Sequence, residues 1–528
     1  MFQPTRQTQL YLLSASSALL MLWAIPPQRQ GWLAWIALVP LLVAIASAAT
    51  LRQAFAVGWL FGTLMLGLSW NRLHPALQSF EGLSPALAWP LFAMVIGQAA
   101  LAWALFAGSF WQLRKVWPAW PMAVQAPILL TCAEFLVPGL FHFHLGLTQA
   151  AYPWITQVAD FSGVVGVSFL IAMFNGCLYD VFRAGLQRHK VPWRALVLTL
   201  TLMAAALGYS HVRIGQIDDA RRLSPKLRIG VVQSNISVAD ANNPALSNAQ
   251  LARHFRKSRQ LQQRGAELIV WPETTYPFYV SRHAAEPGQS GWLQLAADTL
   301  GVPLLVGAYT VDSNTNSNES FASYNSAVLV SPNRSTREIY DKHLLLPVSE
   351  YIPFSNDLPW LKAWFPTPRV LPGTQRTALK LGPHRIGALI CLEDLNPGFV
   401  RGLVPLQPNL LVTLGSDARF GADSVPQQHL AMAQFRSIEM RLDMVRAFYN
   451  GISAIIDANG RVQVQTRAVD PEALPGVRAF GLTGTVALLD GPRSFYACSG
   501  DVFAWLNLLL AFALLVAPPV LDRMRRRA

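Results

Sequence analysis

Eight apolar runs constrain this chain more than any other feature of its sequence. Seven precede residue 212 and one lies near the C-terminus, at 10–25, 32–49, 55–70, 90–110, 120–137, 164–181, 195–210 and 503–520. A membrane-crossing helix needs about 20 mainly apolar residues, so these runs predict a polytopic helical membrane domain with about eight spans. The first run is not expected to be a cleaved signal peptide, because further runs follow at once and no small-residue cleavage site is evident.

Positive residues between the runs predict the orientation. With the N-terminus in the cytoplasm, the inside segments hold 12 Lys and Arg residues and the short outside loops hold two. Positive loops favour the cytoplasmic side. We therefore expect both termini inside the bacterial cytoplasmic (inner) membrane, and the long segment before the last run on the periplasmic side.

The composition of the chain favours a membrane, and not a nucleic acid, as its partner. Hydrophobic residues make up 52% of the chain and charged residues 13%, against about a quarter charged in soluble proteins. The net charge of +13 comes without an aromatic–basic patch or a recognition motif, so no nucleic acid is expected. Cys132, Cys177, Cys391 and Cys498 show no paired metal or redox spacing. We expect no metal and no cofactor.

The segment between the seventh and eighth runs alternates two patterns. Strand-like runs lie at 227–236, 268–271, 302–309, 324–330, 385–390, 410–414 and 451–457, and helix-like runs at 248–263, 292–300 and 427–442. Strands alternating with helices predict an α/β domain. The expected organisation is a membrane domain at 1–212, a soluble domain at 213–501, and a final span with a basic tail at 502–528.

Three segments of the soluble part carry chemistry. Glu273 follows a buried strand in Trp-Pro-Glu, Lys342 lies near Glu350, and Cys391 ends an apolar run in Cys-Leu-Glu393. A carboxylate, an ammonium and a thiol suffice for acyl transfer through a thioester. The carboxylate would act as general base, and the lysine would donate to the oxyanion and favour the thiolate. The alternative for Cys391 is a buried structural thiol or a disulfide with Cys498.

Together these motifs resemble a known family. Trp-Pro-Glu at 271–273, Lys342 with Glu-Tyr-Ile-Pro at 350–353, and Cys-Leu-Glu at 391–393 resemble the nitrilase (carbon–nitrogen hydrolase) superfamily in order and spacing. With seven apolar runs before the domain and one after it, the chain is similar to the membrane branch, the apolipoprotein N-acyltransferases.

The resemblance implies an αββα sandwich with a catalytic triad of Glu273, Lys342 and Cys391, supported by Glu350 and Glu393. It implies that the thiolate takes an acyl chain from a membrane phospholipid, typically phosphatidylethanolamine. The thioester would then pass to the α-amine of a diacylglyceryl-cysteine at the N-terminus of an apolipoprotein. We expect the enzyme to act as a monomer.

Departures from the family pattern leave two alternatives open. Leu392 stands where the family usually has Tyr, and Ser416 and Arg419 lie where Asn and Trp are usual. One alternative is a membrane-tethered amidase or hydrolase, in which water replaces the amine. The other is a catalytically silent paralogue that binds lipoproteins or phospholipid.

A segment at 351–368 combines four prolines with several aromatic residues. Since Trp is enriched where membrane meets water, we hypothesise a loop that touches the bilayer and gates the site. Tyr351, Trp360 and Trp364, together with Trp271 and Leu392, are the candidate substrate contacts. The alternative is an irregular loop packed on its own domain.

Other polar residues receive plainer interpretations. Glu134 lies inside an apolar run and is interpreted as a hydrogen-bonded structural carboxylate that could line a substrate path. His142 and His144 are interpreted as interfacial residues, since a third metal ligand is missing. Arg436, Arg441 and Arg446 are expected on a partly solvated helix face and its exit.

Overall fold

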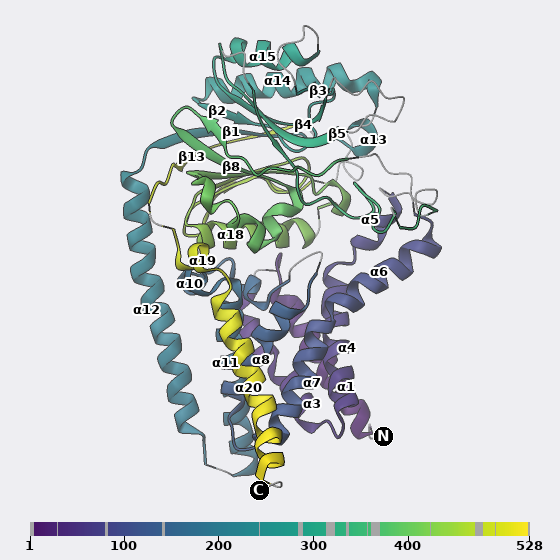
Figure 1. The fold of residues 1–528 in the computed structure, drawn as a ribbon, viewed down its shortest axis with the longest axis vertical. Helices are drawn as coiled ribbons and strands as arrows, with labels where there is room; N and C mark the ends of the chain where they lie inside the picture. Colours follow the sequence, from purple (N-terminus) through teal and green to yellow (C-terminus); the bar gives the residue numbers. More distant parts are fainter. Residues whose placement is uncertain are drawn as a thin grey trace. The chain divides into compact units, whose positions relative to one another are not determined.

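The computed structural model describes most of the chain and divides it into two compact units (Figure 1). The helical unit comprises Met1–His74, Pro85–Gln216 and Ser494–Ala528, and the α/β unit comprises Pro75–Ser84 and Ile217–Arg493. The described residues are 5–28, 30–79, 83–139, 143–188, 190–241, 243–282, 289–312, 323–333, 337–355, 357–360, 370–422, 424–469, 479–491 and 493–525.

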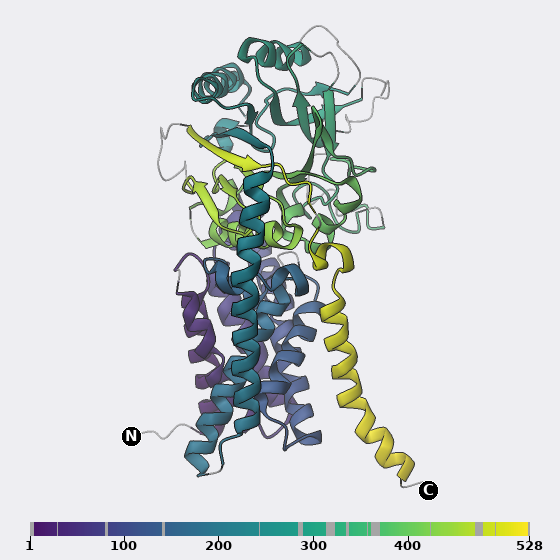
Figure 2. The same ribbon diagram turned by 90° about the vertical axis from the view of Figure 1, so that its left-hand side faces the viewer.

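The helical unit contains long helices and short connecting turns. Its elements are α1 (Arg6–Ala24), η1 (Gly31–Leu33), α2 (Ala34–Ala37), α3 (Val39–Ser47), α4 (Leu51–Ser69), α6 (Pro85–Ala99), α7 (Leu101–Val116), α8 (Met122–Leu136), η2 (Leu145–Gln149), α9 (Pro153–Thr156), α10 (Ala159–Ser162), α11 (Val164–Gln187), α19 (Phe495–Ser499) and α20 (Val502–Arg525). Helices α5 (Leu73–Ser79) and α12 (Trp193–Leu223) run from one unit into the other. Figure 2 shows α12 continuous over its whole length.

Four stretches of the described chain are long and apolar enough to cross a membrane: Leu51–Ser69, Pro85–Val116, Val164–Gln187 and Trp193–Leu223. Shorter apolar helices lie at Gly31–Ser47, Met122–Leu136 and Val502–Val516. The helical character of this region is confirmed, while the count of about eight spans stays a prediction. The run predicted at 90–110 falls on two helices, α6 and α7, which meet at Ala100.

Small and amide residues allow the helices of this unit to pack closely. Helix α11 contacts α8 at Gly176, where an added Cβ would lie 2.5 Å from the Met122 carbonyl oxygen. Buried Asn175 on α11 donates from Nδ2 to the Ala34 carbonyl, and its Oδ1 accepts from Leu38 N at 2.9 Å. These bonds satisfy backbone groups where the chain changes from α2 to α3, as an apolar environment requires.

The described strands of the α/β unit form two sheets. The seven-stranded sheet has the order β13-β1-β2-β4-β5-β6, with β3 paired to β4, and the six-stranded sheet has the order β12-β11-β10-β9-β8-β7. The strands are β1 (Lys226–Gln233), β2 (Leu268–Val270), β3 (Val280–Ser281), β4 (Leu304–Val311), β5 (Ser323–Val330), β6 (Arg337–Asp341), β7 (Leu379–Leu381), β8 (His384–Ile390), β9 (Leu410–Gly415), β10 (Met444–Phe448), β11 (Ala454–Ile456), β12 (Val462–Gln465) and β13 (Phe480–Ala487).

Helices cover both outer faces of this pair of sheets (Figure 1). One hydrophobic cluster lies between the sheets and includes Val270 of β2, Ile390 of β8 and Val412 of β9. A second cluster joins the first sheet to α14 (Ser247–Gln263) and α15 (Gln289–Leu300), and α18 (Ser424–Met440) covers the second sheet. The nitrilase-like αββα arrangement is therefore confirmed. The remaining short elements are α13 (Val238–Ala241), η3 (Pro244–Leu246), η4 (Cys391–Leu395), α17 (Pro397–Arg401), η5 (Val404–Leu406) and η6 (Ala418–Phe420).

Every strand-like and helix-like run predicted for this region overlaps an element of the matching type. The strands that the sequence analysis missed are β3, β6, β7, β10, β12 and β13. Strand β10 includes Arg446, and β6 contains four polar residues among its five. In these two strands, charged residues hide the apolar alternation on which a strand prediction depends.

Candidate active site

Cys391 lies at the end of β8, where the chain turns into the short helix η4. Its φ of 51° is in the left-handed region, which is costly for a residue with a side chain and often marks functional sites. The residue is partly exposed, whereas the preceding Ile390 is buried in the core between the sheets. Cys391 and Cys498 are both free thiols in the structure.

Lys342 follows β6 and joins two carboxylates that come from different segments. Its Nζ lies 3.1 Å from Glu273 Oε1 and 2.8 Å from Glu350 Oε2. Asn325 of β5 bridges the same carboxylates, with Nδ2 donating to Glu273 Oε1 at 2.8 Å and to Glu350 Oε1 at 3.0 Å. All four side chains are buried. The structure therefore brings three of the predicted residues together and adds an amide that the sequence analysis missed.

The charges in this group stabilise one another. Burial by itself lowers the pKa of Lys342, but the carboxylates of Glu273 and Glu350 outweigh burial and hold that pKa well above its ordinary value. Burial raises the pKa of Glu350, yet the Lys342 ammonium outweighs it and leaves the pKa lowered. Lys342 is therefore a fixed cation, suited to donate hydrogen bonds to a developing anion and unsuited to act as a base.

Cys391 interacts electrostatically with the same three residues. Burial raises the pKa of the Cys391 thiol well above its ordinary value, the Glu273 carboxylate raises it further, and Lys342 lowers it. At neutral pH the sulfur is therefore a thiol, and it needs a base at the moment of attack. The neighbouring carboxylate Glu273 is the group in this set that can take the proton.

Glu393 connects the cysteine segment to the lysine segment. Its Oε2 accepts from Ile390 N at 2.7 Å and from the Tyr340 hydroxyl at 2.8 Å, and its Oε1 accepts from His343 N at 2.6 Å. Burial raises the pKa of Glu393 to about 7, although these hydrogen bonds lower it. Glu393 thus fixes the residues on either side of the site and acts as a positioning residue. Its partner Tyr340 was not among the predicted site residues.

A second buried ion cluster lies behind the cysteine turn. His429 of α18 contacts Asp394 Oδ1 through Nε2 at 2.7 Å and Asp417 Oδ1 through Nδ1 at 3.0 Å. Arg446 Nη1 lies 2.6 Å from Asp394 Oδ2. Since Asp394 is three residues after Cys391, the cluster anchors the turn that presents the thiol. The described residues contain no group of three His, Cys, Asp or Glu placed to hold a metal ion.

These contacts correct the prediction of a partly solvated arginine face. Arg436, Arg441 and Arg446 are all buried. Arg436 pairs with Glu439 at 2.9 Å, Arg441 donates to the Ala458 carbonyl, and Arg446 lies on β10 rather than on a helix. The prediction was wrong because carboxylate and carbonyl partners offset the cost of burying the charges, and for Arg441 and Arg446 these partners lie in other segments, which the spacing of the arginines does not show.

The cluster predicts a pH-dependent stability. Burial lowers the pKa of His429, but Asp394 and Asp417 outweigh it and raise the pKa to about 9. The folded protein therefore binds a proton that the unfolded chain releases above about pH 6.5. This stabilisation is complete below about pH 6.5 and is lost as the pH rises through about 9, a loss of roughly 3 kcal/mol.

We expect thermal unfolding in detergent to show a melting temperature that falls between pH 7 and 9. His429→Gln should be less stable at pH 7 and should lack this fall. The control His384→Gln, at the start of β8, should keep it. A wild-type melting temperature that is constant over this range would contradict the charged state of His429.

The candidate substrate contacts are dispersed. Trp271 is fully buried in the cluster under α14 and α15, and its Nε1 donates to Ser258 Oγ at 2.8 Å. The side chains of β2 alternate, so a residue next to core-facing Val270 points to the helices, and the prediction of a substrate contact at Trp271 is wrong. Tyr351 and Trp360 are exposed, and Leu392 is partly buried. Trp364 and His142 lie outside the described residues.

The first comparison with known proteins concerns the α/β unit and the class of protein to which it is similar. Residues 228–472, which include all the residues of this site, match the carbon-nitrogen hydrolase family model. Among solved structures, the chain is similar to Saccharomyces cerevisiae Nit3 of the nitrilase superfamily, with 15% identity and a TM-score of 0.38, covering 52% of this chain and 94% of that one. The family-model match, over residues 228–472, is what relates the α/β unit to the carbon–nitrogen hydrolase class.

Sequence matches that include the helical unit identify a family within this class. Residues 17–177 match the apolipoprotein N-acyltransferase N-terminal domain. The chain is 31% identical to the apolipoprotein N-acyltransferase of Geobacter metallireducens over 94% of this chain and 92% of the relative, and 29% identical to that of Pseudomonas syringae over 78% and 80%. The chain belongs to the apolipoprotein N-acyltransferase family. It is a membrane acyltransferase that acts in the N-acylation of lipoproteins, with phospholipid and lipoprotein as its substrates.

Proposed function

We propose that the reaction runs through a thioester on Cys391 in two half-reactions at one site. In the first, Glu273 takes the thiol proton while the sulfur attacks an ester carbonyl of the phospholipid. Lys342 donates a hydrogen bond to the oxyanion. The tetrahedral intermediate then expels the glyceryl oxygen, which receives the proton from Glu273, and the lysophospholipid leaves.

The second half-reaction uses the same groups in reverse. The α-amine of the diacylglyceryl-cysteine attacks the thioester carbonyl, and Glu273 accepts a proton from the amine. Collapse of the intermediate breaks the carbon–sulfur bond and returns the proton to Cys391. The products are the N-acylated lipoprotein and the free enzyme, as expected for a ping-pong path.

The observation that carries this proposal is the contact of one buried ammonium with two carboxylates beside a neutral thiol. Lys342 Nζ lies within 3.1 Å of both Glu273 and Glu350, and the Cys391 thiol interacts electrostatically with all three groups. Such a set provides the nucleophile, a base for its proton and a fixed donor for the oxyanion. Glu350 then serves to balance and orient Lys342.

We further propose the domain bounds, the membrane orientation, the acyl donor and the oligomeric state of the enzyme. Residues 1–212 would form the membrane domain, 213–501 the periplasmic catalytic domain, and 502–528 the last span of a protein in the bacterial inner membrane. Phosphatidylethanolamine would be the acyl donor, and the enzyme would work as a monomer. The loop charges, with 12 positive residues inside and two outside, support this orientation.

Mass spectrometry of the purified protein tests both half-reactions. Mixing with phosphatidylethanolamine should add one acyl group, sensitive to hydroxylamine, to the wild-type protein. A diacylglyceryl peptide should then clear the group much faster than water does. Equal clearing by water and peptide would indicate a hydrolase, and no adduct with any phospholipid would indicate the silent paralogue.

The loop containing Trp360 supports one prediction about access. Trp360 and Phe354 are exposed, with 54% and 73% of their surface accessible. If the loop touches the bilayer, Trp360→Ala combined with Trp364→Ala should slow thioester formation from vesicle lipid about tenfold, since each exposed Trp at a membrane interface contributes binding energy. A short soluble ester should react at the wild-type rate.

The control for this experiment is Tyr279→Ala, which removes an exposed aromatic side chain outside the loop. It should leave both substrates unaffected. Equal losses on vesicle lipid and soluble ester in the tryptophan double variant would disprove a gate.

A further inference from the structure

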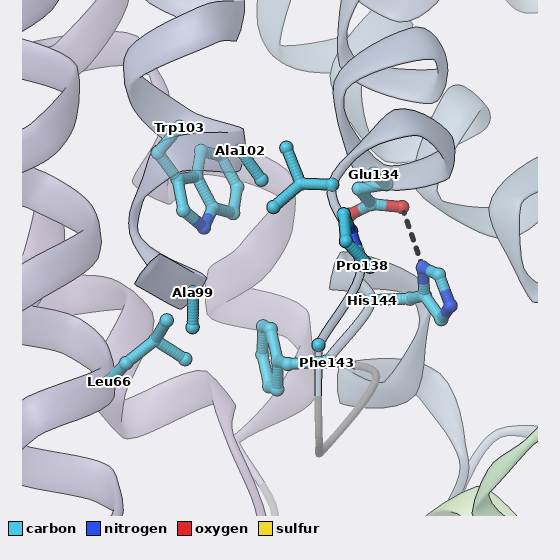
Figure 3. Close-up of a pocket in the computed structure, with 10 residues that line it drawn as sticks. Leu66, Ala99, Ala102, Trp103, Glu134, Pro138, Phe143 and His144 are labelled. Carbon is cyan, nitrogen blue, oxygen red and sulfur yellow. Dashed lines mark ion pairs between the residues drawn. The ribbon is translucent and has the colours of Figure 1, made fainter. Parts of the chain in front are cut away.

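The helical unit contains a cavity of about 30 Å³ among α4, α6, α7 and α8 (Figure 3). Glu134 and His144 lie on one side of it, and Trp103, Ala99 and Leu66 on the opposite side, with Phe143 between them. Its volume exceeds the roughly 10–15 Å³ that one water molecule needs. The cavity can therefore take a small chemical group, but not a whole lipid.

Two acceptor atoms in the wall of this cavity lack hydrogen-bond partners. Glu134 Oε1 accepts from Leu145 N at 2.7 Å, which confirms the structural role expected for this carboxylate. Glu134 Oε2 and His144 Nδ1 lie 3.4 Å apart, an ion pair when His144 is protonated (Figure 3), but neither atom makes a hydrogen bond within the described residues. Both side chains are at least nine-tenths buried. A buried carboxylate oxygen without a partner is costly, and intramembrane carboxylates usually serve a function.

The chemistry of the wall selects the kind of group that fits. A phosphate would be repelled by the Glu134 carboxylate. A primary ammonium carries one positive charge and three N–H donors in a small volume, so it can donate to Glu134 Oε2 and to His144 Nδ1 together. The rings of Trp103 and Phe143 in the lining favour a cation further. A quaternary ammonium has the charge but no N–H to donate.

We propose that this pocket binds the primary ammonium group of a lipid substrate. Glu134 lies two residues before the end of α8, close to the end of an apolar helix, where a lipid head group is within reach. Two sources share this chemistry: the ethanolamine head group of the acyl donor, and the α-amine of the diacylglyceryl-cysteine acceptor, which would have to leave the pocket and lose a proton before it attacks the thioester. The proposal rests on the proposed function and names the substrate group that the pocket recognises.

Lipid binding to a protein that cannot turn over tests the pocket directly. In the Cys391→Ala background, native mass spectrometry should show phosphatidylethanolamine retained in preference to phosphatidylcholine with identical acyl chains. Glu134→Gln keeps an acceptor for Leu145 N, removes the charge, and replaces the second carboxylate oxygen by an amide NH2 that cannot accept from an ammonium. It should reduce this preference about tenfold, the usual effect of losing a hydrogen bond to a charged group.

Two further variants keep the result interpretable. His144→Leu removes the second acceptor and should reduce the preference by a smaller factor, even if Glu134→Gln fails to fold. Asp180→Asn is the matched control, because Asp180 is also a carboxylate in an apolar helix, but it accepts from Ala123 N and does not line the cavity. It should keep the wild-type preference.

Kinetics with active Cys391 assigns the source of the ammonium. If the head group is bound, Glu134→Gln should slow thioester formation from phosphatidylethanolamine and leave formation from phosphatidylglycerol unchanged. If the acceptor amine is bound, Glu134→Gln should slow only the clearing of the thioester by the diacylglyceryl peptide.

The proposal is overturned if Glu134→Gln and His144→Leu match Asp180→Asn in both lipid preference and both half-reactions. Failure of the proposed function gives a different result, since no thioester would form from any phospholipid in the wild-type protein. The lipid preference measured with Cys391→Ala would still report on the pocket in that case.

Discussion

Replacing Cys391 by alanine is expected to abolish both the acyl adduct and lipoprotein acylation, with a loss of at least about 10⁴-fold in rate, because no other group can replace the nucleophile. The fold should be unaffected, since alanine differs from cysteine only by the loss of one sulfur atom. Alanine keeps the Cβ atom, so the backbone strain at a φ of 51° remains and the melting temperature should change little. The measurement is intact-protein mass spectrometry together with an assay of peptide acylation.

Cys498→Ala provides the matched control. Cys498 is an exposed free thiol, so it would be labelled by any nonspecific acylation. The variant should retain full activity and the full adduct. An adduct that persists in Cys391→Ala and disappears in Cys498→Ala would show that Cys498 is the acylated thiol, and it would refute the mechanism.

Lys342→Met is expected to have the second large effect, because it removes the oxyanion donor and the only cation that contacts Glu273 and Glu350 in the described structure. Loss of one oxyanion donor costs about 10²–10³-fold in rate. Two buried carboxylates would then face each other without compensation, which should destabilise the protein by about 3–5 kcal/mol. The rate of thioester formation and the melting temperature are the measurements.

A double variant separates these two effects. Lys342→Met with Glu350→Gln removes one positive and one negative charge, so the melting temperature should recover in part while the rate remains low. Lys380→Met, at an exposed position on β7, should change neither quantity. Recovery of both stability and rate in the double variant would show that Lys342 acts only as a structural counter-ion.

Several features of the fold could be predicted because they depend on local pattern. The apolar runs locate the helical region, and alternating strand-like and helix-like runs define the α/β unit. Both signals survive in sequence because burial imposes a period of 3.6 or 2 on the residues of each element. The exact number of spans is harder to predict from sequence. Short apolar helices such as α8, and an apolar run divided into two helices such as α6 and α7, have no sequence signal that marks where each helix begins.

The chemistry was predicted only in part. Glu273 and Cys391 could be chosen because each stands in a short motif after a strand-like run, and Lys342 because its segment with Glu350 resembles a family motif. Asn325 and Tyr340 stand in no motif, and their importance follows from contacts across 52 and 53 residues of sequence. A hydrogen bond over such a separation leaves no periodic trace in the chain.

The sequence by itself determined that the chain has a membrane part and an α/β part, and that a carboxylate, an ammonium and a thiol follow one another in that order. Only the tertiary structure decided which charges are buried together. In the structure, Lys342 contacts both Glu273 and Glu350, and Arg446 pairs with Asp394. Trp271 packs against the helices on the outer face of its sheet. The reason is physical: the cost of burying a charge depends on the partner that meets it in space, and position along the chain does not reveal that partner.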